Sequence, residues 1–63
     1  MDSESIIGKR VRLISTSDQY THLTPGELGY VRFVDDMGTV MVKWDSGSVL
    51  GMIEGEDFFE FVD

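Results

Sequence analysis

Three kinds of side chain in this sequence could bind a partner or do chemistry, namely carboxylates, cations and aromatic rings, and they make up two candidate groups. A first candidate group combines rings and carboxylates and consists of Asp18, Tyr20, Glu27, Glu54, Glu56 and Asp57. Tyr20 with Asp18 and Glu27 can form a shallow groove for a proline-rich or arginine-containing peptide, because the ring packs on the peptide and the carboxylates pair with its cation. Glu54, Glu56 and Asp57 would surround this groove with negative charge. The alternative is that Tyr20 only packs its own loop onto the protein.

A second candidate group is cationic and consists of Lys9, Arg10, Arg12, Arg32 and Lys43. These residues would bind phosphate groups if folding gathered them on one face. The alternative is structural: Arg10 and Arg12 share one strand face, where like charges need solvent or acidic neighbours, and the second half of the chain offers many acids. The net charge of −7 disfavours nonspecific nucleic-acid binding, so this function is our second choice.

The sequence contains no recognisable catalytic or metal-binding pattern. A histidine base needs a partner at fixed geometry, and the single histidine, His22, has Ser17 and Asp18 near it only in sequence. Zinc is not expected in a chain with one histidine and no cysteine. The carboxylates at 35–36 and 54–57 lack the spacing of a calcium loop and are explained as turn residues on a solvated face. We therefore predict no enzymatic activity, no cofactor and no metal.

The 63 residues suffice for one domain, which we place at residues 6–63 after a flexible tail at residues 1–5. Residues 1–34 balance in charge, whereas residues 35–63 carry Lys43 alone against eight acids. Solubility is the simplest explanation of this acidity, and a basic partner or a saline habitat are the alternatives. No apolar run approaches the roughly 18–20 residues that span a membrane, and the acidic N-terminus is unlike a signal peptide. We expect a soluble cytoplasmic protein.

Strands must position these side chains. The two clearest predicted strands form a hairpin. Val40, Val42 and Trp44 alternate with other residues, as in a half-buried strand. Asp-Ser-Gly at 45–47 has the chemistry of a tight turn, and Leu50 continues the apolar pattern on the return strand. An isolated hairpin is marginally stable in water, so further strands must pack against it.

Three further strands are predicted, at residues 9–15, 28–35 and 59–62. Val11 and Leu13 are expected to face inward from the first. In the second, the spacing of Val31 and Val34 favours a β-bulge that turns Phe33 outward, and strict alternation with Phe33 inside is the alternative. Five short strands indicate a small, strongly bent all-β barrel, because closure limits exposed strand edges.

The predicted connections include one long loop and one short one. The long loop follows the first strand at residues 16–26, and the side chains expected to hold it to the barrel are Tyr20, His22 and Leu23. A 3₁₀ turn at 56–58 is possible before the last strand. The rings expected to serve the core or seal one end of the barrel are Trp44, Phe59 and Phe61.

A set of spaced residues resembles a known family. The residues are the run Ile7–Leu13, Tyr20-Thr21, Leu23, Pro25-Gly26, Gly29, Val31, Asp35-Asp36, Gly38-Thr39, Val42, Trp44-Asp45, Gly47-Ser48, Leu50-Gly51 and Gly55–Asp57. Together they resemble the domain of unknown function 4314, a family of small SH3-like barrels found often as short stand-alone proteins in prokaryotes and their viruses. The match extends from Ile7 to Val62 and departs at Gln19 and Glu54, where the family often has proline. The resemblance implies a five-stranded SH3-like barrel and a prokaryotic source, but no activity.

We predict a non-enzymatic protein-interaction module that binds a protein or peptide partner through the long loop and the acidic face. One alternative is nucleic-acid or ribosome-associated binding by the cationic group, as in SH3-like barrels of the KOW type. Another is a homo-oligomer, which would pair through an apolar patch drawn from Phe33, Met41 and Val49.

Overall fold

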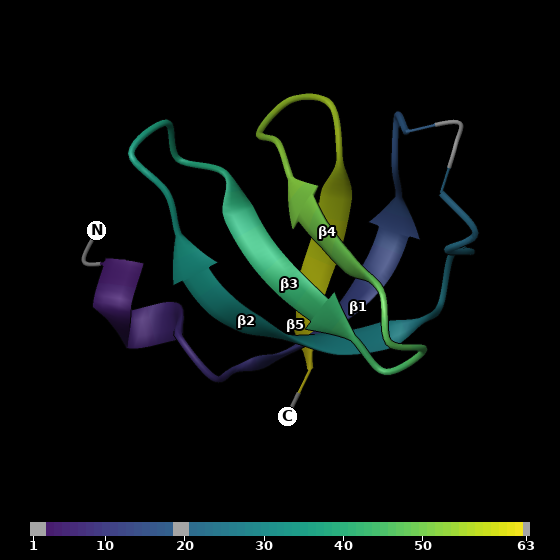
Figure 1. Cartoon of the computed structure of the whole chain (residues 1–63), viewed down its shortest axis with the longest axis horizontal. Helices are drawn as coiled ribbons and strands as arrows, with labels where there is room; N and C mark the ends of the chain where they lie inside the picture. Colours follow the sequence, from purple (N-terminus) through teal and green to yellow (C-terminus); the bar gives the residue numbers. More distant parts are fainter. Residues whose placement is uncertain (1–2, 19–20, 63) are drawn as a thin grey trace.

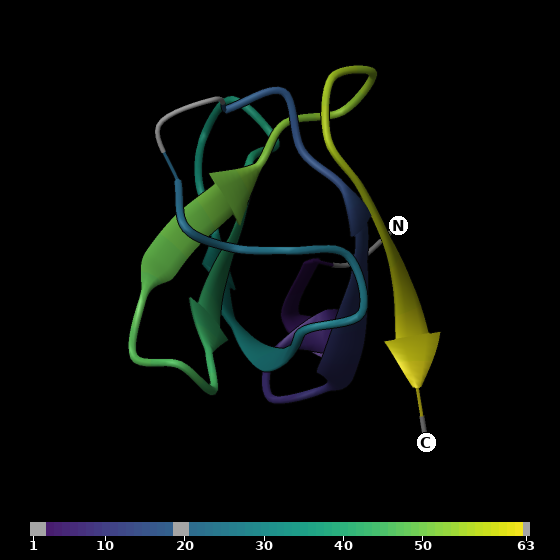
Figure 2. The same ribbon diagram turned by 90° about the vertical axis from the view of Figure 1, so that its right-hand side faces the viewer.

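The computed structural model describes residues 3–18 and 21–62. Its strands are β1 (Arg10–Ser15), β2 (Leu28–Val34), β3 (Val40–Trp44), β4 (Val49–Met52) and β5 (Phe58–Val62), preceded by the 3₁₀ helix η1 (Ser3–Ile6). The strands form one antiparallel sheet in the order β4-β3-β2-β1-β5 (Figure 1). The sheet curls, so that its edges β4 and β5 stand on either side of an opening (Figure 2). The predicted all-β, five-stranded SH3-like barrel is confirmed.

The core lies where the period of two directs apolar side chains inward. Its strand residues are Val11, Leu13, Val31, Val42, Trp44 and Met52, each at most 2% exposed. Trp44 is the largest of them, and its indole N–H donates a hydrogen bond to the carbonyl of Leu50 at 3.3 Å. A fully buried side chain of this kind stabilises the fold by about 1.5–3 kcal/mol, so these six positions hold the curled sheet together.

The long loop between β1 and β2 covers the opening between the two edge strands. Figure 2 shows the part of the loop after residue 20 crossing from the β4 side to the β5 side. Leu23 anchors it, because this side chain is only 7% exposed and joins the core. The expectation that His22 also holds the loop is wrong, since His22 is exposed. Tyr20, the third expected anchor, lies outside the described residues.

Strand β2 contains an irregularity that turns Phe33 toward solvent. The register of β2 on β3 shifts between Val31 and Phe33. Val31 is fully buried, Phe33 is 46% exposed and Val34 is partly buried. The β-bulge is therefore confirmed, and strict alternation is not observed. Arg32 and Phe33 are both exposed as a result, next to Met41 on β3.

Two glycines permit backbone geometry that other residues would disturb. Gly47 has φ of 101° in the predicted turn at 45–47, and its amide donates to the carbonyl of Trp44 at 2.8 Å. Gly29 allows β2 and β3 to approach, because an added Cβ would lie 2.7 Å from the carbonyl oxygen of Lys43. The predicted hairpin of β3 and β4 is confirmed together with its turn.

The C-terminal region differs from expectation at two places. A single turn precedes β5, but it spans 53–57 rather than 56–58, since the amides of Glu56 and Asp57 both donate to the carbonyl of Ile53, at 3.0 and 2.9 Å. Phe61, which was expected to serve the core or to seal one end of the barrel, does not belong to the core and is 49% exposed. It lies near the end of an edge strand and packs edge-to-face on Phe59, with ring centroids 5.4 Å apart.

Candidate functional site

Most of the cationic group lies on the outer face of the sheet. Its members there are Arg10, Arg12, Arg32 and Lys43. The strand register aligns Arg10 with Tyr30 and Tyr30 with Lys43, so these three residues form one row across β1, β2 and β3. Lys9 is exposed immediately before β1. Strand pairing thus gathers cations that are far apart in the sequence.

Two of these cations are held by carboxylates. The guanidinium of Arg10 donates to both oxygens of Asp45, at 2.9 and 2.7 Å, and Arg12 donates to Glu60 at 3.1 Å. The hydrogen bonds from Arg10 lower the pKa of Asp45, and the carboxylate in turn raises the pKa of Arg10. Both acids belong to the second half of the chain, so the structural interpretation of Arg10 and Arg12 is confirmed.

The other outer-face cations, Arg32 and Lys43, form no ion pair with any residue that the structure describes. Two half-exposed rings, Tyr30 and Phe33, belong to the same face of β2. Rings beside cations can stack on nucleobases or guanidinium groups. This part of the face is able to bind either a phosphate chain or another protein surface.

Carboxylates gather at one end of the barrel. Three connecting segments lie there (Figures 1 and 2): residues 16–18, 35–39 and 53–57. We call this region the acidic end, and its carboxylates are Asp18, Asp35, Asp36, Glu54, Glu56 and Asp57. Asp36, Glu54 and Glu56 are exposed and, within the described part of the chain, have no cationic partner. They present negative charge to solvent.

A pocket of about 300 Å³ opens at the acidic end, between the turns 35–39 and 53–57. Its apolar walls include Val40, Met52, Phe58 and Phe59, and Glu54 contributes an exposed carboxylate. The sequence did not predict this pocket. A local signal for it was the adjacent pair Phe58 and Phe59, since both rings line the pocket and Phe58 is 52% exposed.

Asp57 ties two connections together from a buried position, at 7% exposed. One carboxylate oxygen accepts hydrogen bonds from the Thr16 hydroxyl, the Ser17 amide and the Ser17 hydroxyl, at 2.9, 2.8 and 3.2 Å. The other accepts from the Ile53 amide at 2.8 Å. Burial raises the pKa of Asp57, but these hydrogen bonds lower it more, so the net pKa lies below the ordinary value. A partner that bound this carboxylate, as the sequence analysis proposed, would have to break these bonds.

The other members of the predicted partner-binding group are not equally accessible. Glu27 braces a turn, because its carboxylate accepts from the amide and the hydroxyl of Thr24 at 2.6 and 3.3 Å. Asp18 is partly buried. Tyr20 lies outside the described residues, so its groove stays a prediction. The described members that are exposed at the acidic end are Glu54 and Glu56.

Among residues 3–18 and 21–62, no three His, Asp or Glu side chains are arranged to hold a metal ion. None of the helices found there combines the length and the apolar character that crossing a membrane requires.

Comparison with known proteins agrees with the resemblance seen in the sequence. The family described as Domain of unknown function (DUF4314) matches residues 3–62 of the chain. No curated protein and no solved structure matches the chain. Since the family match covers nearly the whole chain, this protein belongs to the DUF4314 family.

Proposed function

We propose that this protein is a non-enzymatic binding module that takes a cationic segment of a partner protein at its acidic end. The observation that supports the proposal is the pocket, which combines apolar walls with the exposed carboxylate of Glu54. An apolar side chain of the partner would enter the pocket, and a neighbouring lysine or arginine would pair with Glu54, Glu56 or Asp36. The pocket would give specificity, and the carboxylates would speed association and exclude acidic partners.

The proposal is tested by affinity capture from a nuclease-treated host lysate. Glu54→Gln/Glu56→Gln removes two charges from the acidic end. Asp45→Asn/Glu60→Gln removes two charges from the sheet face and is the matched control, since both variants change the net charge equally. We expect a protein that the unmodified chain and the control retain and that Glu54→Gln/Glu56→Gln loses. Raising the salt concentration should also weaken retention, because exposed charges are screened beyond about 8 Å at 0.15 M salt.

Two results would contradict binding at the acidic end. Equal loss in both variants would mean that net charge alone attracts the partner. Disappearance of every captured protein on nuclease treatment would favour a nucleic-acid function instead.

A second candidate function is the binding of single-stranded nucleic acid by the outer face of the sheet. The row of Arg10, Tyr30 and Lys43, with Arg32 nearby on β2, favours it. The bonds of Arg10 and Arg12 to carboxylates and the net charge of −7 oppose it. A fluorescent oligonucleotide titrated at low salt distinguishes the two functions.

If the outer face binds nucleic acid, the two cations without an ion pair among the described residues should set the salt dependence. The slope of log affinity against log salt should then be about −1.4, since each neutralised phosphate of a single strand contributes about −0.7. Arg32→Gln/Lys43→Gln should abolish binding, and Asp45→Asn/Glu60→Gln should strengthen it. Absence of binding at low salt would remove this candidate.

A further inference from the structure

The outer face of β2 and β3 carries an apolar patch at the end nearest the turn 35–39. Phe33 and Met41 are register partners on the two strands, and Met37 belongs to the turn and is 91% exposed. We call these three residues the outer patch. Gly51 on β4 leaves room for Met41, because an added Cβ at this glycine would lie 2.7 Å from the sulfur of Met41. The side chain of Met41 is thereby laid against β4, which extends the patch across a third strand.

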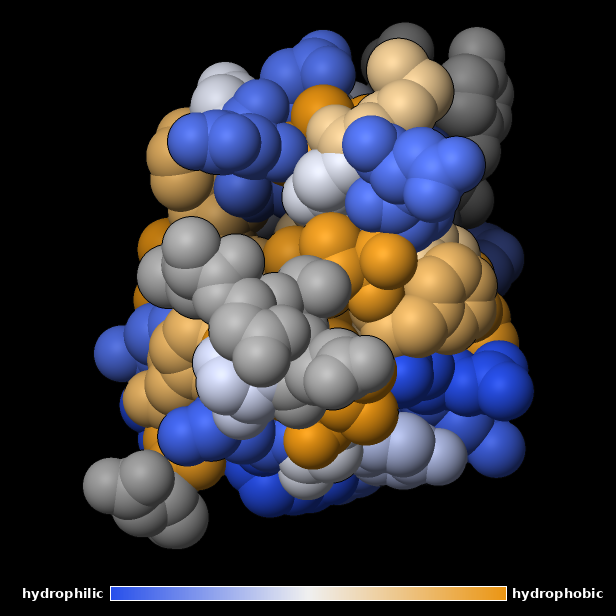
Figure 3. Space-filling view, turned by 90° about the vertical axis from the view of Figure 1, so that its left-hand side faces the viewer, coloured by the Kyte–Doolittle hydropathy of each residue, from blue (hydrophilic) through white to orange (hydrophobic). Residues whose placement is uncertain are grey.

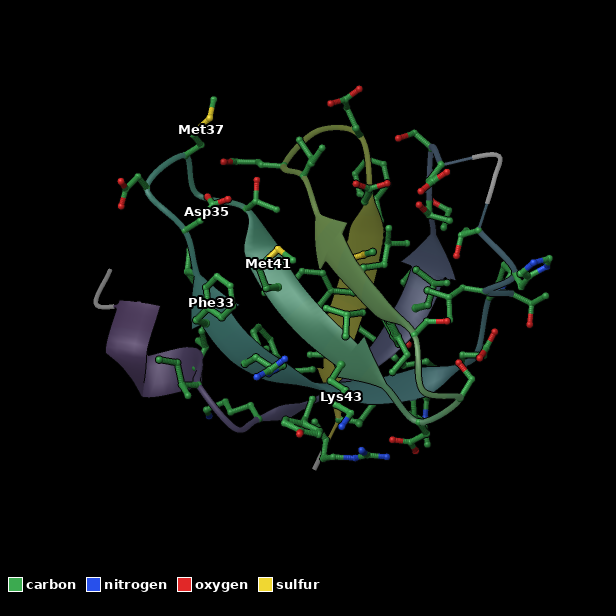
Figure 4. All side chains as sticks on the ribbon, viewed as in Figure 1. Phe33, Asp35, Met37, Met41 and Lys43 are labelled. Atoms are coloured by element: carbon green, nitrogen blue, oxygen red, sulfur yellow. The ribbon has the colours of Figure 1, made fainter. Side chains whose placement is uncertain are left out.

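Opposite charges lie on the two sides of the Phe33–Met41 pair, and Met37 lies beyond the acidic side (Figure 4). In Figure 4, Asp35 lies above Met41 and Phe33, and Lys43 lies below them on β3. Lys43 is two residues from Met41, a separation of about 6.6 Å along a strand. On the acidic side, the carboxylate of Asp35 accepts from the amides of Met37 and Thr39, both at 2.9 Å, and this fixes the shape of the turn.

The wider surface follows the same division. Asp36 adds a second exposed carboxylate to the turn, and Arg32 adds a second cation to the strand side. Seen from the side of η1, apolar atoms lie across the middle of the molecule, with hydrophilic residues above and below them (Figure 3). The face therefore has an acidic side, an apolar middle and a basic side.

We propose that the outer patch docks on the outer patch of a second copy of this chain, related by a two-fold axis that lies in the interface near Phe33 and Met41 and runs perpendicular to β3. A two-fold rotation about such an axis reverses the direction of β3. The acidic turn of one copy then meets Lys43 of the other, and the same contact forms a second time. Self-association buries the apolar middle and pairs both charged sides with opposite charges, whereas an acidic or a basic partner would pair with only one side. This inference does not depend on the function proposed for the acidic end.

The size of the patch sets the expected strength of the dimer. A standard interface buries about 800 Å² on each partner, which is about a fifth of the 4376 Å² surface of this chain. Three side chains and their charged flanks cover less than this, so the dimer should be weak and dependent on concentration. Two chains of charge −7 also repel each other at low ionic strength. Dimerisation should therefore be measured at about 0.15 M salt, where the Debye length is about 8 Å.

Sedimentation equilibrium of the whole chain, from about 10 µM to about 1 mM, covers the range expected of a small interface. We expect a monomer–dimer equilibrium. Asp36→Lys should raise the dissociation constant roughly tenfold, because it turns two attractive pairs into two repulsive ones, and Lys43→Glu should do the same. An equimolar mixture of the two variants should restore the dimer, since every facing pair is then attractive. Glu54→Lys changes the net charge as Asp36→Lys does but lies outside this face, so it controls for total charge.

Phe33→Ser tests the apolar middle, and a one-dimensional proton spectrum shows whether this half-exposed position still permits folding. If the folded Phe33→Ser variant remains monomeric where the unmodified chain dimerises, the proposal is supported. The mass of a single chain over the whole concentration range would overturn it. A dimer that is indifferent to Asp36→Lys, Lys43→Glu and Phe33→Ser would overturn it equally, because it would use another face.

Discussion

Asp57 and Asp45 both bind groups that are distant in the sequence, but only one of them is buried. Asp57 accepts from Thr16 and Ser17, which are 41 and 40 residues away, and Asp45 accepts from Arg10, which is 35 residues away. The distances are similar, at 2.7–2.9 Å for the principal bonds. The Asp57 residue is 7% exposed, however, whereas the side chain of Asp45 is 55% exposed.

Hydrogen-bond geometry therefore does not by itself rank these two interactions by their contribution to stability. If the bonds of Asp45 are lost, water replaces them on both partners, and little free energy changes. If the carboxylate of Asp57 is lost, the donors of Thr16, Ser17 and Ile53, whose hydrogen bonds are partly buried, lose their acceptor, and water replaces it less completely. The three predictions below test this ranking and are ordered by the size of the expected effect.

The largest effect is expected from Asp57→Ala. It leaves the amides of Ser17 and Ile53 without their charged acceptor, and a hydrogen bond to a charged group contributes about 1.5–3 kcal/mol. A domain of this length has a free energy of unfolding of about 3–9 kcal/mol, so the variant should be severely destabilised or unfolded in urea titration. Asp36→Ala, at an exposed turn position, should change stability by less than about 0.5 kcal/mol.

A second, milder variant measures the contribution of these hydrogen bonds if Asp57→Ala does not fold. Thr16→Ala keeps the carboxylate but removes the hydroxyl that donates to it and that accepts from the Asp18 amide, and its expected cost is about 1–2 kcal/mol. If Asp57→Ala matched the unmodified chain within about 0.5 kcal/mol, the structural role of Asp57 would be wrong.

The next effect concerns pH. The pKa of Asp57 in the folded chain lies below its unfolded value, so its ionised form is favoured by folding. This stabilisation is present in full above the ordinary aspartate pKa, about 3.9, and is lost as the pH falls through the lower folded value. Urea titrations from neutral to acidic pH should therefore show declining stability, and Asp57→Asn should have a shallower decline. Identical pH profiles for the two chains would contradict this assignment.

The smallest effect is expected from Asp45→Asn. The pair of Asp45 and Arg10 is exposed, and both groups are well hydrated when they separate. The urea midpoint should not change resolvably, and added salt should remove any difference that remains. A loss comparable to that of Asp57→Ala would break the ranking, because it would make the surface ion pair as important as the buried carboxylate.

Much of the fold could be predicted from residues close together in the sequence. Alternation placed Val11 and Leu13 inside, and the spacing of Val31 and Val34 indicated the bulge. Gly47 marked the turn of the central hairpin. Each of these depends on backbone geometry over a few residues, which local sequence records.

The site was less predictable, because its parts come from separate connections. Asp57 was assigned to partner binding, yet four hydrogen bonds within the protein occupy its carboxylate. The pocket was not foreseen, since its walls belong to β3, β4 and β5 and meet only when the sheet curls. The alternation of side chains within one strand does not predict which three strands will come together.

The sequence by itself determined the strands, the turns and the surplus of acid, because side-chain period, glycine positions and charge are local properties. It offered acids of the second half as neighbours for Arg10 and Arg12, with a phosphate-binding face as the alternative, and did not indicate which acids. Tertiary structure alone decided that Asp45 and Glu60 are their partners, that Asp57 is buried and that Lys43 joins the cations of β1 and β2. These outcomes depend on strand order and on the curl of the sheet, which bring together distant residues, such as Arg10 and Asp45 at a separation of 35 positions, that no local pattern connects.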